Sequence, residues 1–142
     1  MHMATLVATR FSIVTTLPRT LIIARHLLHQ YGFYHHCAGL HAIDLPVLAL
    51  EDGSGRAQEQ VRQRCIQALK EDGCGAIVLG CGGMATLAQE LTRELHVPVI
   101  DGVSAAVKMV ESLVALGLST SKQGDLAFPE AKNLGGRFQS FN

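Results

Sequence analysis

The stretch "IVLGCGGM" (residues 77–84) joins a short apolar run to a cysteine that is surrounded by glycines. The apolar run predicts a buried strand, and the helix-forming residues after Met84 predict a helix. In open parallel sheets, ligands bind beyond the carboxyl ends of the strands. We therefore expect Cys81 to lie where a strand passes into a helix, at an edge of the sheet that can bind a ligand.

The same succession of strand and helix occurs four times along the chain. Apolar runs between amphipathic helices indicate a parallel sheet that is covered on both faces. We expect an α/β fold of three layers, with a doubly wound, flavodoxin-like parallel sheet of four strands in the order 2-1-3-4. Strands are predicted within residues 10–16, 37–51, 74–81 and 97–101, and helices over residues 17–32, 54–70, 84–95 and 102–116.

The helix predicted over residues 17–32 has a clear apolar face. Pro18 suits its first turn and Gly32 suits its end. The spacing of its apolar residues predicts that this face is buried against the sheet. The residues concerned are Leu21, Ala24, Leu27, Leu28 and Tyr31.

The last part of the chain differs from the rest. Residues 118–142 have no hydrophobic periodicity and are rich in Gly, Ser, Lys and Asn. We expect residues 1–117 to form one α/β lobe. Residues 118–142 are expected to form a C-terminal tail that is loose or packs on something outside this lobe.

Composition excludes several classes of protein. Hydrophobic residues make up 48% of the 142 residues and charged residues 17%, which argues against disorder. Twelve basic residues balance twelve acidic ones, so neither a nucleic acid nor an anionic membrane is an expected partner. No apolar run is long enough to cross a bilayer, and no signal peptide is recognised. Four cysteines without a CxxC pair predict free thiols and a cytoplasmic protein.

The surroundings of Cys81 favour chemistry at its thiol. Gly80, Gly82 and Gly83 leave the backbone open to a ligand. The N–H groups at the start of the next helix favour negative charge, and therefore the thiolate. The pattern suits a nucleophile or a proton-transfer base. The alternative is a small buried residue at the end of a strand.

Hydroxyl groups follow the first predicted strand in a similar way. Thr15, Thr16 and Thr20 stand around the start of a helix, where hydroxyls and amides together can bind a carboxylate or an imide carbonyl. The alternative for Thr16 is simple capping of that helix. Asp101 is expected mainly to cap the helix that follows the fourth strand.

The sequence does not predict a metal centre. His35, Cys37 and His41 alternate along the second predicted strand, but zinc ligands normally converge from separate segments. We expect these histidines to be solvated. His26 and His29 lie three residues apart without an HExxH pattern, and no glycine-rich nucleotide-binding motif is present.

Four segments together resemble a known group of enzymes. They are "RFSIVTTLPRT", "AIDLPVLALE", "AIVLGCGGMA" and "VPVIDGVSAAVKMVESLVALGLSTSK". In this order they resemble the aspartate/glutamate racemase superfamily, within it the hydantoin racemase branch that includes allantoin racemases. The resemblance runs from about residue 10 to residue 122. It implies an isomerase of two similar α/β lobes with the active site between them, and this chain corresponds to the C-terminal lobe only. It also implies that the tail packs on the other lobe.

The resemblance also implies a mechanism without metal or organic cofactor. Two thiols, one from each lobe, face opposite sides of a carbon next to a carbonyl. One removes a proton and the other delivers one, so that the chirality inverts. By position, the residues that match are the second-lobe thiol Cys81 and the substrate-binding residues Thr15, Thr16, Gly82 and Gly83.

Three functions stay open at this stage. The first is a hydantoin or allantoin racemase whose activity is impaired in a chain of this length, because Cys37 and Cys65 lie in the wrong contexts to replace the first-lobe thiol. The second is a single-thiol decarboxylase or isomerase of the same superfamily. The third is a non-enzymatic module for small-anion binding or assembly. The expected partners are a small hydantoin-like or allantoin-like molecule and either a second copy of the chain or the missing N-terminal lobe.

Overall fold

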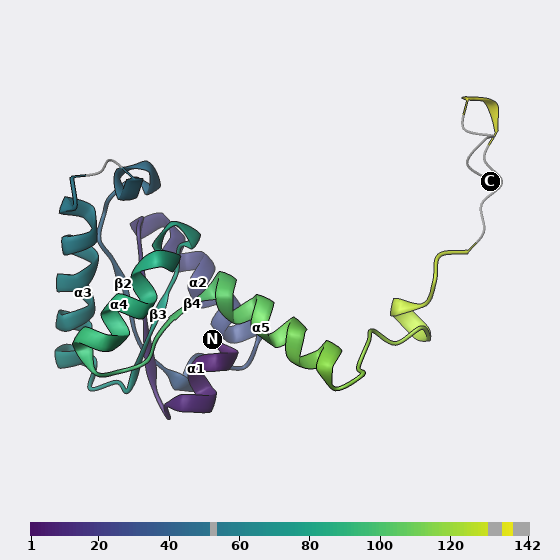
Figure 1. Cartoon of the computed structure of the whole chain (residues 1–142), viewed down its shortest axis with the longest axis horizontal. Helices are drawn as coiled ribbons and strands as arrows, with labels where there is room; N and C mark the ends of the chain where they lie inside the picture. The colour runs from purple at the N-terminus through teal and green to yellow at the C-terminus, as the bar shows by residue number, and fades with distance from the viewer. Residues whose placement is uncertain (52–53, 131–134, 138–142) are drawn as a thin grey trace. The chain divides into compact units, whose positions relative to one another are not determined.

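The computed structural model describes residues 1–51, 54–130 and 135–137 and has an α/β fold (Figure 1). Its main elements are α1 (His2–Val7), β1 (Phe11–Thr15), α2 (Leu21–Gln30), β2 (Cys37–Ala42), α3 (Arg56–Asp72), β3 (Ala76–Leu79), α4 (Ala85–Leu95), β4 (Val99–Asp101) and α5 (Gly102–Ala115). Short 3-10 turns are η1 (Pro18–Thr20), η2 (Tyr34–His36), η3 (Val47–Glu51), η4 (Gly82–Met84) and η5 (Gly124–Leu126).

The chain divides into two units, Met1–Met109 and Val110–Asn142. The division falls within α5, and the lobe boundary expected at residue 117 stays a prediction. The first unit holds the whole sheet. Among the described residues, no helix has the length and apolar character needed to cross a membrane.

The sheet has four parallel strands in the order β2-β1-β3-β4, which confirms the predicted order. In this register Val14 of β1 lies between His41 of β2 and Leu79 of β3. Leu79 in turn lies beside Asp101 of β4. The carboxyl ends of β1, β3 and β4 therefore meet at one edge of the sheet.

Helices cover both faces of the sheet (Figure 1). Because side chains alternate along a strand, Val14 and Leu79 face α3 and α4, whereas Ile13 and Val78 face α1 and α2. Every side chain of β1 and of β3 is buried. β1 and β3 are thus the two central strands, as the predicted order required.

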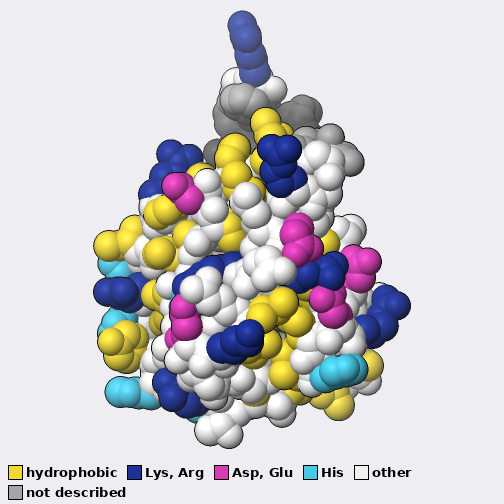
Figure 2. Space-filling view, turned by 90° about the vertical axis from the view of Figure 1, so that its left-hand side faces the viewer, with side chains coloured by type: hydrophobic (Ala, Val, Ile, Leu, Met, Phe, Trp, Pro, Cys, Tyr) yellow, Lys and Arg dark blue, Asp and Glu magenta, His cyan; other side chains and the backbone are white. Residues whose placement is uncertain are grey.

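The α3 helix packs through one stripe and is solvated on the other. Its buried residues recur at helical spacing, and Gly73 ends the helix in a left-handed conformation (φ 58°), with its N–H bonded to the Leu69 carbonyl. On the outer side, Arg62 pairs with Glu94 at 2.6 Å. Figure 2 views the molecule from the side of Figure 1 that α3 occupies, and there basic and acidic side chains lie interspersed.

One predicted buried face and one predicted helix differ in burial from the rest of the lobe. In α2 only Leu28 is buried, and Tyr31, which was expected in the core, is 51% exposed. Ala24 and Leu27 of this face line a pocket, described below, together with Ile13 and Val78 of the sheet. The α5 helix forms over nearly the predicted residues, but none of its side chains is buried.

A partly buried polar cluster lies between α3 and the sheet. Asp72, the last residue of α3, accepts hydrogen bonds from Ser12 Oγ at 2.5 Å and from His41 Nε2 at 2.6 Å. Arg64 donates to the other ring nitrogen of His41. Because a guanidinium can only donate, Nδ1 of His41 accepts and its Nε2–H donates. The expectation that His41 is solvated was wrong, since this residue is 9% exposed.

The cluster holds Asp72 in its ionised form. Burial by itself would raise the pKa of Asp72, but the hydrogen bonds from Ser12 and His41, together with the charge of Arg64, lower it. The carboxylate therefore ties the end of α3 to β1 and β2.

Replacing Gly39 with alanine is expected to lower the free energy of unfolding by about 1–3 kcal/mol. The added Cβ would overlap the carboxylate of Asp72 and lie 2.5 Å from His41 Nε2. Urea unfolding followed by circular dichroism measures the change. Gly102→Ala is the matched control, because a Cβ there has no neighbour within 4 Å. Equal stability of the two variants would contradict this account.

Candidate functional site at the carboxyl edge of the sheet

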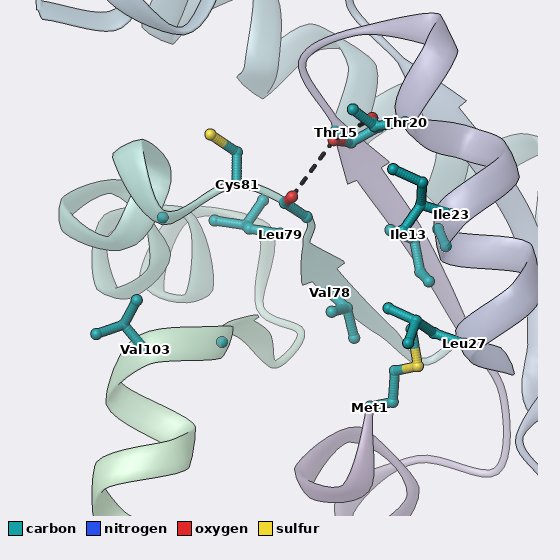
Figure 3. A pocket seen from close by; sticks show the side chains of 14 residues that line it. Met1, Ile13, Thr15, Thr20, Ile23, Leu27, Val78, Leu79, Cys81 and Val103 are labelled. Carbon is teal, nitrogen blue, oxygen red and sulfur yellow. Dashed lines mark hydrogen bonds between the residues drawn. The ribbon is translucent and has the colours of Figure 1, made fainter. Parts of the chain in front are cut away.

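Cys81 lies where the sequence placed it, between β3 and the helical turn η4. Its backbone is extended (φ −141°, ψ 132°), and its carbonyl accepts a hydrogen bond from Met84 N at 3.1 Å. Met84 is fully buried and anchors the turn in the core. Figure 3 shows Cys81 beyond the end of β3, with its sulfur pointing away from the strand. The residue therefore caps the helical segment that continues into α4.

The backbone after Cys81 is open. Gly82 and Gly83 are exposed, and Cys81 itself is half-buried. The first hydrogen bond of the turn is donated by Met84 N, so the N–H groups of these two glycines belong to the donors that a helix leaves at its N-terminal end, directed away from the helix body. Such donors favour an anion beside them. This arrangement can stabilise negative charge on a bound ligand.

A pocket of about 430 Å³ lies beside Cys81 (Figure 3). It brings together Thr15, Cys81 and Gly82 of the predicted site residues, and Thr20 also lines it. Sequence reasoning missed the rest of the lining, because aliphatic residues on strands and helices are indistinguishable from core residues. These include Ile13, Ile23, Leu27, Val78 and Val103.

The hydroxyl of Thr15 is engaged inside the protein. Its Oγ1 lies 3.1 Å from Thr20 Oγ1 and 3.4 Å from the carbonyl oxygen of Gly80. Thr20 Oγ1 donates to the Leu17 carbonyl at 2.7 Å. Thr15 is only 2% exposed, so its hydroxyl is directed at the protein more than at the open pocket.

The other two predicted contacts lie outside this pocket. Thr16 is buried, and the N-cap of η1 is Leu17, so the capping role considered for Thr16 was wrong. A Cβ added at Gly83 would lie 3.8 Å from Cys81 Sγ and 3.2 Å from Leu50 Cδ1. Gly83 therefore borders the sulfur without lining the pocket.

Asp101 has the capping role that the sequence predicted. Its Oδ1 accepts a hydrogen bond from Ser104 N at 2.7 Å, at the first turn of α5. This bond fixes the start of the helix that supplies Val103 to the pocket.

The other cysteines are poor candidates for proton transfer. Burial raises the pKa of Cys65 to about 12. Burial also raises the pKa of Cys37 to about 11, although a hydrogen bond with the backbone of Gly39 partly opposes it. Cys74 is buried in the core under α3 and α4. Over the described ranges, no group of three or more His, Cys, Asp or Glu side chains is arranged to hold a metal ion.

A parallel α/β lobe with a thiol at its carboxyl edge is the arrangement that the sequence resemblance led us to expect. Residues 1–110 match the family model described as Asp/Glu/Hydantoin racemase. The chain belongs to this family.

Two groups of relatives, allantoin racemases and hydantoin racemases, are similar to this chain. It is 87% identical to a solved allantoin racemase from Klebsiella pneumoniae, with a TM-score of 0.88 over 99% of this chain and 58% of that one. A solved allantoin racemase from Pseudomonas fluorescens is 41% identical, with a TM-score of 0.82 over 95% of this chain and 57% of that one. The hydantoin racemase of Rhizobium meliloti is 47% identical over 135 residues, 95% of this chain and 56% of that protein. The chain thus spans about half the length of the relatives it matches.

Proposed function

We propose that this chain supplies Cys81 as one of two proton-transfer groups of a racemase that acts on allantoin or a related 5-substituted hydantoin. The observation that carries this proposal is the position of Cys81, at the start of a helix and beside a pocket at the carboxyl edge of the sheet. Family membership and the names of the relatives support the substrate class.

The proposed chemistry needs no cofactor. The Cys81 thiolate removes the proton from the carbon next to the ring carbonyl, and the electron pair of that C–H bond moves toward the carbonyl oxygen. N–H groups at Gly82 and Gly83 are suited to stabilise the resulting oxyanion. A second acid then donates a proton to the opposite face of the carbon. The first thiol returns to its thiolate by losing its proton to solvent, and the second group regains a proton from solvent.

The second acid is expected to come from another lobe. All four cysteines lie in the described part of the chain, and the other three are buried or have a raised pKa. Large apolar side chains stand exposed on α2 and α5, among them Ile22, Ile23, Val107 and Val110. We propose that a second lobe or a second copy of the chain covers such surface. Alone, the chain is expected to racemise substrate poorly.

The proposal is tested by incubating one enantiomer of allantoin in deuterated water. We compare the chain alone with a chimera in which it is joined to the part of the Klebsiella pneumoniae allantoin racemase that it does not cover. The chimera is expected to invert the substrate and to place deuterium at the stereocentre, at a rate well above that of the chain alone and of buffer.

The other outcomes separate the alternative functions. Deuterium found only in a shortened or isomerised product would support a single-thiol decarboxylase or isomerase instead. Binding of allantoin without any labelling by the folded chimera would support a binding module.

A further inference from the structure

The peptide that carries Cys81 is held on both sides by hydrogen bonds. Upstream, Gly80 N donates to the Val14 carbonyl at 2.8 Å; downstream, the Cys81 carbonyl accepts from Met84 N at 3.1 Å. These bonds are made by the backbone. A side chain makes a further hydrogen bond to this peptide: Thr15 Oγ1 lies 3.4 Å from the carbonyl oxygen of Gly80.

Thr15 and Gly80 are also in tight contact. A Cβ added at Gly80 would lie 2.9 Å from Thr15 Cβ and 3.1 Å from Thr15 Oγ1. The Thr15 carbonyl accepts a hydrogen bond from Ile43 N at 3.0 Å, which fixes this end of β1 to the segment after β2. Thr15 therefore packs directly against Gly80 and is itself bonded to the segment after β2.

We propose that Thr15 is a positioning residue for Cys81, in place of the direct substrate contact that the sequence resemblance implied. A peptide group is planar, so the Gly80 carbonyl and the Cys81 N–H turn together. By holding the Gly80 oxygen, Thr15 sets the direction in which Cys81 leaves the strand, and thereby keeps Sγ at the start of η4 and α4. The inference rests on the proposed role of Cys81.

The directions of the hydroxyl protons agree with this role. Thr20 uses its single proton on the Leu17 carbonyl, and can therefore only accept from Thr15. The Thr15 proton is shared between Thr20 Oγ1 and the Gly80 oxygen. Thr20 thus keeps the Thr15 side chain turned toward Gly80, and away from a ligand in the pocket.

The test measures alkylation of Cys81 by iodoacetamide in the intact chain, followed by mass spectrometry of the peptide that contains it. The rate at about pH 7 is divided by the rate at about pH 10, where thiols are largely ionised. This ratio reports the thiolate fraction and cancels changes in exposure. Thr15→Val keeps the shape of the side chain and removes the hydroxyl, and is expected to lower the ratio about threefold to tenfold. Thr15→Ser is expected to restore it.

Thr92→Val is the matched control for general loss of stability. Thr92 is a part-buried threonine whose hydroxyl bonds to the Ala88 and Val99 carbonyls, and it does not line the pocket beside Cys81. Its substitution is expected to lower the melting temperature and to leave the alkylation ratio unchanged. An unchanged ratio in Thr15→Val, or an equal fall in Thr92→Val, would overturn the positioning role.

The same experiment separates this inference from the proposed function. If Cys81 of the unaltered chain shows no higher ratio than free cysteine, its role as a proton-transfer thiolate fails, and with it any need for positioning. If the unaltered chain shows a raised ratio that Thr15→Val retains, Cys81 keeps its proposed role and only the inference about Thr15 is wrong.

Discussion

Replacing Cys81 with alanine in the racemase chimera is expected to slow inversion of allantoin by a factor on the order of 10³. The reason is that the variant lacks the group that exchanges a proton with one face of the substrate carbon. Of the four described cysteines, Cys81 alone lines the pocket. No other thiol of the chain can therefore replace it at that position. Chiral chromatography of the substrate over time measures the rate.

The matched control is Cys37→Ala. Cys37 is half-buried at the start of β2, where burial raises its pKa to about 11, and it does not line the pocket. This variant should invert allantoin at nearly the rate of the unaltered chimera. Racemisation that survives in Cys81→Ala would remove Cys81 from the mechanism. With the enantiomer whose proton faces Cys81, solvent deuterium should enter the stereocentre in the control variant and not in Cys81→Ala.

Replacing Asp72 with alanine is expected to cause the largest loss of stability, about 3–5 kcal/mol in the free energy of unfolding. The substitution removes the shared acceptor of Ser12 and His41, and both donors are buried. It also removes the negative charge that His41 links to the guanidinium of Arg64. Urea unfolding measures the effect. Glu71→Ala, one residue earlier and exposed, removes a 3.3 Å contact to Arg64 and should cost under about 1 kcal/mol.

The same carboxylate makes stability depend on pH. The pKa of Asp72 is lower in the folded chain than its ordinary value, so its contribution to stability is fully present above about pH 4 and is lost as the pH falls through the folded value. Asp72→Asn cannot titrate there. The difference in stability between the unaltered chain and Asp72→Asn should therefore shrink as the solution is acidified. A constant difference would show that the cluster does not depend on the ionised carboxylate.

The order of the strands and the position of Cys81 were accessible from the sequence. The apolar run before Gly80 and the helical pattern after Met84 are local signals, since burial on both faces gives an unbroken apolar strand and burial on one face gives a helix its periodicity. The parallel β/α alternation then leaves few arrangements of four strands, and the predicted one is observed. The cap at Asp101 is local in the same sense, because donor and acceptor lie three residues apart.

Only the tertiary structure decided what the polar side chains contact. Thr15 and Thr16 are adjacent in the sequence and carry the same hydroxyl, yet Thr15, the last residue of β1, lines the pocket, whereas Thr16, in the bend after the strand, is buried without lining it. Gly80, one of the two partners of the Thr15 hydroxyl, lies 65 residues away, and Ser12 and Asp72 are separated by 60. Such contacts depend on strand register and on where a helix ends over the sheet. The local sequence determines where strands, helices and turns form. The packing of distant segments determines that Thr15 contacts Gly80 and that Asp72 is held between α3 and the sheet.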